Sequence, residues 1–179
     1  MKILVTGGVR SGKSRHAESL LSEAASVAYV APGPTAEEEP DPDWVARLAS
    51  HRARRPEGWR TVESRDLAGA LKIASAEGDA VIVDCLGTWL TAVMDSRGLW
   101  EASSDEASAV VSALAGEAAD VLDRGDTDVV LVTNEVGLGV VPAHRSGRLF
   151  RDLLGMVNQR LAEACDEVHL VVAGRVLKL

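Results

Sequence analysis

The sequence contains little cysteine. Its 179 residues include only Cys85 and Cys165, which lie 80 positions apart. Neither belongs to a CxxC pair or to a cluster of cysteine and histidine, which argues against a disulfide framework and against a cysteine-based metal site. We expect both thiols to be buried and inert.

An excess of positive charge is also absent. The net charge is −8 and the isoelectric point is near 5.0. A protein whose main task is to hold a nucleic acid needs a basic surface that displaces counterions, so the charge argues against a nucleic-acid partner. Any phosphate group that this protein binds must be held by a local site.

No long apolar run opens the chain. Only residues 3–5 are continuously apolar before the first glycine, which is too short for a signal peptide or a membrane span. We therefore predict a cytoplasmic protein without a membrane span.

Short apolar runs instead recur along the chain, with longer helix-compatible segments between them. Runs with few polar interruptions are typical of strands that are buried on both faces of a parallel sheet. Residues 14–25 and 104–123 have apolar positions at helical spacing and predict crossover helices, whereas the proline-rich acidic residues 32–42 predict a solvated loop. The predicted strands are 3–5, 27–31, 80–83, 129–133, 169–173 and 176–179.

This alternation predicts the α/β class, with a mostly parallel sheet flanked by helices. Hydrophobic residues make up 46% of the chain, enough to bury one continuous core. We predict a single domain over residues 1–179.

A phosphate-binding pattern, G-x-x-x-x-G-K-[ST], follows the first predicted strand directly and leads into helical sequence. Glycines allow backbone N–H groups to wrap an anion, and the helix adds its positive N-terminal end. We expect Lys13 to reach the β- and γ-phosphates and Ser14 to ligate Mg²⁺. An incidental glycine-rich turn is the alternative, but strand, motif and helix are all in register. The predicted phosphate-binding residues are Gly7, Gly8, Val9, Arg10, Ser11, Gly12, Lys13 and Ser14.

A second metal ligand is expected at the end of a neighbouring buried strand. Asp84 follows residues 80–83 and is the predicted Walker-B aspartate. The alternative is that Asp84 only caps the next helix. Asn134 and Glu135 follow another strand at the edge where open α/β sheets bind ligands, and their role stays undefined.

Residues 47–55 hold four arginines and one histidine in an otherwise acidic chain. A charge run is most often a solvated helix face, and this interpretation stays open. The functional alternative is an anion site in which neutral His51 attacks an α-phosphorus while arginines stabilise the developing charge, as in a nucleotidyl transferase. His16, His144 and His169 lack such surroundings, and we expect them to have structural roles.

Three blocks of sequence resemble one family: GGVRSGKSRHAE, HRARRPEGWRT and NEVGLGVVPAHRSGRLFRDLLGMVNQRLAEACDEVHLVVAGRVLKL. The chain is similar over essentially its whole length to the bifunctional adenosylcobinamide kinase / adenosylcobinamide-phosphate guanylyltransferase family. The resemblance implies a RecA-like P-loop NTPase architecture and a homotrimer. It also implies two reactions: phosphorylation of adenosylcobinamide by ATP or GTP, then transfer of GMP from GTP through a guanylylated histidine to give adenosylcobinamide-GDP.

The matching catalytic histidine is His51, at the head of an H-R-x-x-R-P-x-x-W pattern. Some family members have two adjacent histidines where this chain has Ser50 and His51, so only one is available here. The resemblance implies a corrinoid and a nucleoside triphosphate as substrates. The motif itself predicts Mg²⁺ on Ser14 and Asp84. Further nucleotide contacts are implied for Ala31, Pro32, Gly33, Arg52, Ala53, Arg54, Arg55, Glu63 and Asp84.

Two other functions remain open. One is a kinase alone, in which the segment around His51 is only an arginine-rich lid. The other is a regulatory nucleotide switch, although the sequence has no recognisable base-specificity motif of the GTPase type. The four tryptophans are expected to be buried in packing, and the alternative is that Trp89 lines a corrinoid site or a subunit interface.

Overall fold

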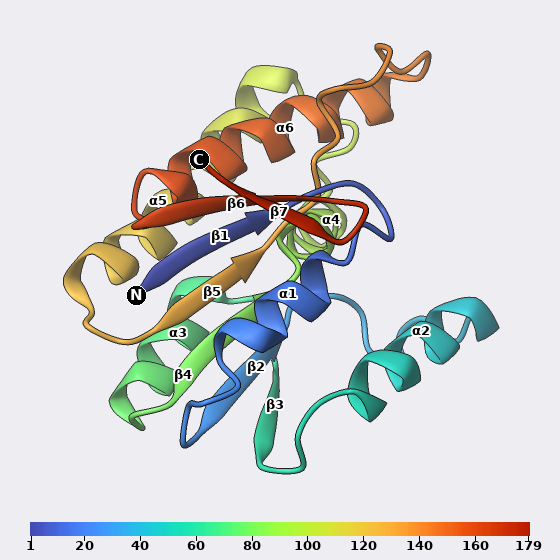
Figure 1. Cartoon of the computed structure of the whole chain (residues 1–179). Helices are drawn as coiled ribbons and strands as arrows, with labels where there is room; N and C mark the ends of the chain where they lie inside the picture. The colour runs from blue at the N-terminus through green and yellow to red at the C-terminus, as the bar shows by residue number, and fades with distance from the viewer.

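The computed structural model describes residues 1–179 and contains one seven-stranded sheet, with the strand order β3-β2-β4-β5-β1-β6-β7 (Figure 1). The strands are β1 Lys2–Thr6, β2 Val27–Ala31, β3 Trp59–Glu63, β4 Ala80–Asp84, β5 Val129–Val132, β6 Glu167–Val172 and β7 Arg175–Lys178. The helices are α1 Lys13–Leu20, α2 Pro42–Ala53, α3 Leu67–Ala76, α4 Leu86–Ser96, α5 Ser104–Arg124 and α6 Arg145–Ala162.

Strands β1 to β6 all run parallel, and only β7 is antiparallel to its neighbour β6. The predicted α/β class and the mostly parallel sheet are therefore confirmed. Parallel strands end at the same edge, so the loops that follow β1, β2, β3, β4 and β5 meet there. This edge holds the residues that the motifs singled out.

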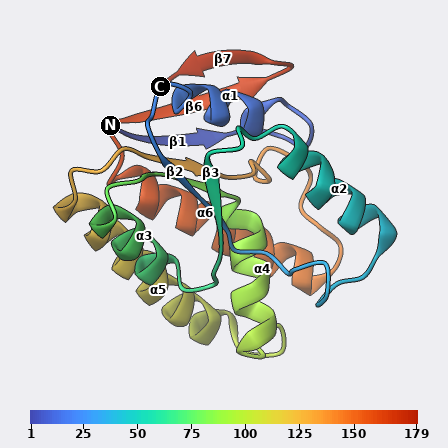
Figure 2. The same cartoon turned by 90° about the horizontal axis from the view of Figure 1, so that it is seen from below.

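Helices cover both faces of the sheet. Helices α3, α4, α5 and α6 lie on one face, and α1 lies on the other (Figure 2). The first face buries a cluster of 29 residues and the second a cluster of 11, so the α3–α6 side forms the main core. The smaller cluster includes Ala17 and Leu21 from α1 and its end, which fixes the helix that follows the phosphate-binding loop.

The backbone of helix α2 lies to one side of the sheet and of the other helices (Figures 1 and 2). None of its residues is buried. Its start is set by Asp41, whose carboxylate accepts hydrogen bonds from the backbone N–H groups of Asp43 and Trp44, each at 3.0 Å. Pro42 at the first helical position supports the same start. The acidic segment before it is a loop, as expected.

Strand β3 was not predicted by the sequence pattern. It is an edge strand with the sequence WRTVE, in which no residue is fully buried. A run of buried apolar residues is the signal of a central strand, and an edge strand does not need it. Two smaller differences are that α1 ends at Leu20, before the predicted residue 25, and that β6 begins two residues early.

The tryptophans and cysteines follow the expectations only in part. Trp89 is 1% exposed and donates its indole N–H to the Arg65 carbonyl at 3.1 Å, so its packing role is confirmed. The other three tryptophans are only partly buried. Cys85 is buried and Cys165 half-buried, and both are free.

Burial raises the pKa of both thiols, that of Cys165 to about 12. A thiol is a weak nucleophile until it loses its proton, which supports the expected lack of reactivity. No helix combines the length and the apolar character that a membrane crossing requires.

A chain of hydrogen bonds joins the β6–β7 hairpin to α1. His16 Nε2 lies 2.8 Å from His169 Nδ1, and His169 Nε2 lies 2.7 Å from a carboxylate oxygen of Glu167, to which Lys178 also donates at 2.9 Å. Burial lowers the pKa of His16, and the neighbouring His169 and Lys178 lower it further. These contacts give both histidines a structural role.

We predict that the free energy of unfolding falls as the pH drops below about 6.5, the ordinary pKa of an unfolded histidine. The unfolded chain then binds a proton at residue 16 that the folded protein, with its lowered His16 pKa, takes up only at lower pH. Urea unfolding of wild type and a His16→Asn variant between about pH 7 and pH 5 measures this. The free energy of unfolding of His16→Asn should depend less on pH than that of wild type. His144→Asn changes an exposed histidine and should keep the pH dependence of wild type.

Candidate active site

The phosphate-binding loop joins β1 to α1. Gly12 caps the helix in the left-handed conformation, with φ 97°, which only glycine adopts without strain. Lys13 is 7% exposed and donates from Nζ to the Gly8 carbonyl at 3.1 Å, so its ammonium group lies inside the loop. Burial lowers the pKa of Lys13, while the nearby Asp84 acts in the opposite direction. The loop therefore has a pre-placed cation for an anionic ligand.

The C-terminal β6–β7 hairpin packs against this loop. The Gly174 N–H donates to the Ser11 carbonyl at 2.8 Å. A Cβ atom on Gly7 would lie 2.4 Å from the carbonyl oxygen of Val171 in β6. Glycine is required at position 7 by the protein's own backbone, quite apart from any ligand.

Asp84 ends β4 with a side chain that is 7% exposed. Tyr29 donates its hydroxyl to Asp84 Oδ2 at 2.8 Å, and His51 Nδ1 lies 3.6 Å from the same oxygen. Burial acts to raise the pKa of Asp84, but the neighbouring His51, Tyr29 and Ser14 outweigh it and hold the pKa below its ordinary value. The carboxylate is thus charged and faces the end of α2.

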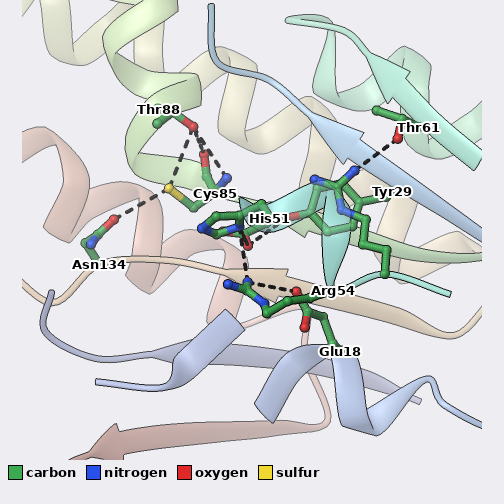
Figure 3. Close-up of polar contacts among 10 residues, drawn as sticks. Glu18, Tyr29, His51, Arg54, Thr61, Cys85, Thr88 and Asn134 are labelled. Carbon is green, nitrogen blue, oxygen red and sulfur yellow. Dashed lines mark hydrogen bonds and ion pairs between the residues drawn. The ribbon is translucent and has the colours of Figure 1, made fainter. Parts of the chain in front are cut away.

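The arginines beside His51 make contacts that tie α2 to the body. Arg54 Nη2 donates to Glu18 at 3.2 Å and lies 3.4 Å from His51 Nδ1 (Figure 3). Arg52 pairs with Glu63 at 3.1 Å. The cluster is therefore more than a solvated helix face, because its members reach α1 and β3.

Two cavities lie on either side of α2. One, of about 1030 Å³, is lined by the phosphate-binding loop and one side of the helix; the other, of about 580 Å³, is lined by the ends of β2, β3 and β4. His51, Trp44 and Arg47 border both. The predicted residues on the first cavity are Val9, Arg10, Ser11, Gly12, Lys13, Ser14, His51 and Arg54. Those on the second are Ala31, Gly33, His51, Arg52, Ala53, Arg55, Glu63 and Asp84.

Three predicted residues border neither cavity. Gly7 and Pro32 are buried, and Gly8 contributes its carbonyl to Lys13. Asn134 and Glu135 lie nearby but face other partners: Cys85 Sγ lies 3.5 Å from Asn134 Oδ1, and a Glu135 carboxylate oxygen accepts from the Gly137 N–H at 2.6 Å. Their contacts stabilise the loop after β5.

Tyr29 is the residue that the sequence analysis missed. It borders the smaller cavity, and the Arg55 guanidinium lies over its ring, 3.2 Å from the centroid. The available signal was a tyrosine, the only one in the chain, inside the otherwise aliphatic strand VAYVA. Without the fold, nothing in the sequence places it beside Asp84.

The residues present fit Mg²⁺ in the way that nucleotide-binding enzymes hold it. No group of three or more His, Cys, Asp or Glu side chains could form a complete protein cage. Mg²⁺ commonly takes one or two protein ligands and completes its shell with water and phosphate. Ser14 is close enough to Asp84 to lower the pKa of that carboxyl.

The fold and the loop define a P-loop NTPase architecture. The chain is similar to the ATPase EscN of the enteropathogenic E. coli type III secretion system, with TM-score 0.59 and 11% identity over 96% of this chain and 43% of the ATPase. A second type III secretion ATPase aligns with TM-score 0.53 and 12% identity over 94% of this chain and 50% of that one. At these identities the likeness concerns the fold alone.

Within that architecture the sequence identifies the family. Residues 3–179 match the family described as cobinamide kinase / cobinamide phosphate guanyltransferase. The chain is 41% identical to a bifunctional adenosylcobalamin biosynthesis protein of Salmonella typhimurium, over 100% of this chain and 99% of that protein. It is also 41% identical to an Escherichia coli relative and 36% identical to one from Pseudomonas aeruginosa, again over the whole chain. The chain belongs to this family, as the motifs predicted.

We predict that Gly7→Ala destabilises the protein even without nucleotide, because its Cβ would meet the Val171 backbone. Forcing a methyl group into a packed site costs about 1–3 kcal/mol. That loss corresponds to a drop of about 2 °C or more in Tm for a chain of this size. Gly8→Ala is the matched control, since nothing lies within 4 Å of its Cβ position. Equal Tm values for the two variants would contradict the role of the hairpin.

Proposed function

We propose that this chain phosphorylates adenosylcobinamide and then transfers a guanylyl group from GTP to the product, with His51 as the covalent carrier. The observation that carries the proposal is that His51 borders both cavities, one of them formed by the phosphate-binding loop. Family membership supports the two reactions. The geometry supports His51 as the carrier, because none of the other three histidines borders either cavity.

In the proposed kinase step the triphosphate lies in the cavity of the phosphate-binding loop. Lys13 and the backbone N–H groups of the loop bind its phosphates, and Arg10 and Arg15 add positive charge at the cavity wall. When bound by Ser14 and Asp84, Mg²⁺ would neutralise charge on the phosphates. Little covalent work remains for the protein beyond aligning the corrinoid hydroxyl with the terminal phosphate.

In the proposed guanylyl step His51 attacks the α-phosphorus of GTP and pyrophosphate leaves. Arg47 and Arg54 border the same cavity and can stabilise the negative charge that develops. The phosphate of the corrinoid then attacks the guanylyl-histidine and releases His51. Such an N–P bond is stable to base and labile to acid.

We predict that wild type incubated with Mg²⁺ and GTP labelled at the α-phosphate retains label after denaturation, and that His51→Ala does not. The reason is that the variant lacks the attacking nitrogen while keeping the phosphate-binding loop. His144→Ala is the matched control because this histidine is exposed and borders neither cavity. It should label like wild type.

Absence of label on a folded, nucleotide-binding wild type would overturn the covalent step and leave a kinase or a nucleotide switch. Label that survives acid but not alkali would exclude a phosphoramidate.

We further predict that His51→Ala still transfers the γ-phosphate to adenosylcobinamide, whereas Lys13→Ala loses this activity by on the order of a hundredfold. The first variant keeps every group proposed for the kinase step, and the second removes the buried cation. Product formation from γ-labelled ATP and GTP measures both. A protein that hydrolyses nucleotide slowly and never phosphorylates the corrinoid would instead be a switch.

The homotrimer and the cytoplasmic location stay predictions. The loop after β5 exposes Leu138, Val140 and Val141 at 86%, 95% and 63%, and an assembly of subunits would cover such an apolar surface.

A further inference from the structure

The hydroxyl of Tyr29 has a single partner. The side chain is 1% exposed, and its hydroxyl donates to Asp84 Oδ2 at 2.8 Å. A buried hydroxyl is costly unless it is hydrogen-bonded, and a phenylalanine would fill the same apolar space without that cost. The presence of tyrosine here is therefore explained by Asp84.

The ring of Tyr29 is held in place from its open side. The Arg55 guanidinium lies 3.2 Å from the ring centroid, and Arg55 Nη1 donates to the Thr61 hydroxyl at 3.0 Å. The hydroxyl lies 2.8 Å from Asp84 Oδ2, which can only accept, and an ordinary phenol is protonated at neutral pH. The hydroxyl is thus a fixed donor aimed at one carboxylate oxygen.

The same oxygen lies 3.6 Å from His51 Nδ1. On its other side Nδ1 lies 3.4 Å from Arg54 Nη2. The two neighbours favour opposite tautomers, because a carboxylate only accepts and a guanidinium only donates. A proton on Nδ1 leaves Nε2 with its lone pair, whereas a proton on Nε2 leaves Nδ1 as the free nitrogen.

The surroundings of the two neighbours decide between the tautomers. Asp84 has a side chain that is 7% exposed and needs donors to satisfy its charge, whereas Arg54 is 35% exposed. Arg54 Nη2 is also closer to Glu18, at 3.2 Å, than to the imidazole. Catalytic hydrogen bonds are often long before substrate binds and tighten in the complex.

We propose that Tyr29 is a positioning residue: through its hydrogen bond it fixes Asp84, which holds the Nδ1 proton of His51 and leaves Nε2 as the atom that takes the guanylyl group. The proposal rests on the guanylyl transfer proposed above. It adds to that transfer the identity of the reacting nitrogen and the residues that select it.

The covalent step transfers the guanylyl group from GTP to His51. The Nε2 lone pair forms the N–P bond, and the bond from the α-phosphorus to the bridging oxygen breaks, so pyrophosphate leaves with the electron pair. The imidazole becomes cationic because Nδ1 keeps its proton, and the Asp84 carboxylate stabilises this charge. In the second half-reaction a phosphate oxygen of the corrinoid attacks the phosphorus, and the N–P electrons return to Nε2.

The tautomer can be measured on the free protein without any turnover. Long-range ¹H–¹⁵N spectra of histidine-labelled protein, recorded at a pH where an ordinary imidazole is neutral, distinguish a protonated Nδ1 from a protonated Nε2. The four histidines make assignment direct, with His51→Ala identifying the signals of interest. We expect a protonated Nδ1 in wild type and in Arg54→Met, and a mixture of tautomers in Tyr29→Phe.

The kinetic test uses Tyr29→Phe, which keeps the ring beneath Arg55 and removes only the hydroxyl. The maximal rate of His51 labelling from α-labelled GTP should fall about tenfold, the size typical of losing a group that orients a reacting one. The GTP concentration at half-maximal rate should change less than about twofold, since the hydroxyl is committed to Asp84. Phosphorylation of the corrinoid should fall less than the labelling does, because the proposed kinase step uses Asp84 as a metal ligand but does not use His51. Adduct ¹⁵N shifts should place phosphorus on Nε2.

Each contrary result overturns the proposal. The first such result is a protonated Nε2 in wild type, and the second is a guanylyl group on Nδ1. The third is an equal loss of His51 labelling and corrinoid phosphorylation in Tyr29→Phe, because equal losses indicate a general structural effect. If wild type takes up no guanylyl group at all, the proposed function fails instead. The tautomer measurement still decides whether Tyr29 and Asp84 orient His51.

Discussion

The parallel pairing of β1, β5 and β4 is the constraint on which the site depends. Val132 of β5 is in register with Val5 on one side and with Asp84 on the other. The chain that leaves β1 therefore enters the phosphate-binding loop at the level where β4 presents its carboxylate. The apolar runs of these strands supply the burial that holds this register, because a one-residue slip would turn core side chains to the other face.

A second constraint is the charge of Asp84 itself. A buried carboxylate must be satisfied by donors. Tyr29 from β2 donates to Asp84 at 2.8 Å, and His51 from α2 lies 3.6 Å from the same oxygen. Helix α2 buries no residue, and the exposed ion pairs of Arg52 and Arg54 contribute little individually. The position of the histidine thus depends on polar contacts at this edge of the sheet more than on apolar packing.

Burial explains which strands could be predicted from the sequence and which could not. Strands β1, β2, β4 and β5 are buried on both faces and were found within one or two residues. Strand β3 was missed because it lies at the edge with polar side chains, and it carries Glu63, which the family resemblance had named. Residues with an anion-binding motif were found from local pattern alone, since such a motif is contiguous. Tyr29 was not, because its hydrogen-bond partner Asp84 lies 55 positions away in the chain.

The sequence by itself determined the α/β class, the phosphate-binding loop, the aspartate at the end of β4 and the family, because each is written in contiguous residues or in their periodicity. Only the tertiary structure decided that His51 lies between two cavities, and that the Tyr29 hydroxyl and His51 Nδ1 both lie next to Asp84 Oδ2. It also decided that the C-terminal hairpin supports the loop near the N-terminus. These contacts join strands and helices far apart in the chain, and strand order and register, which set them, are not local properties of the sequence.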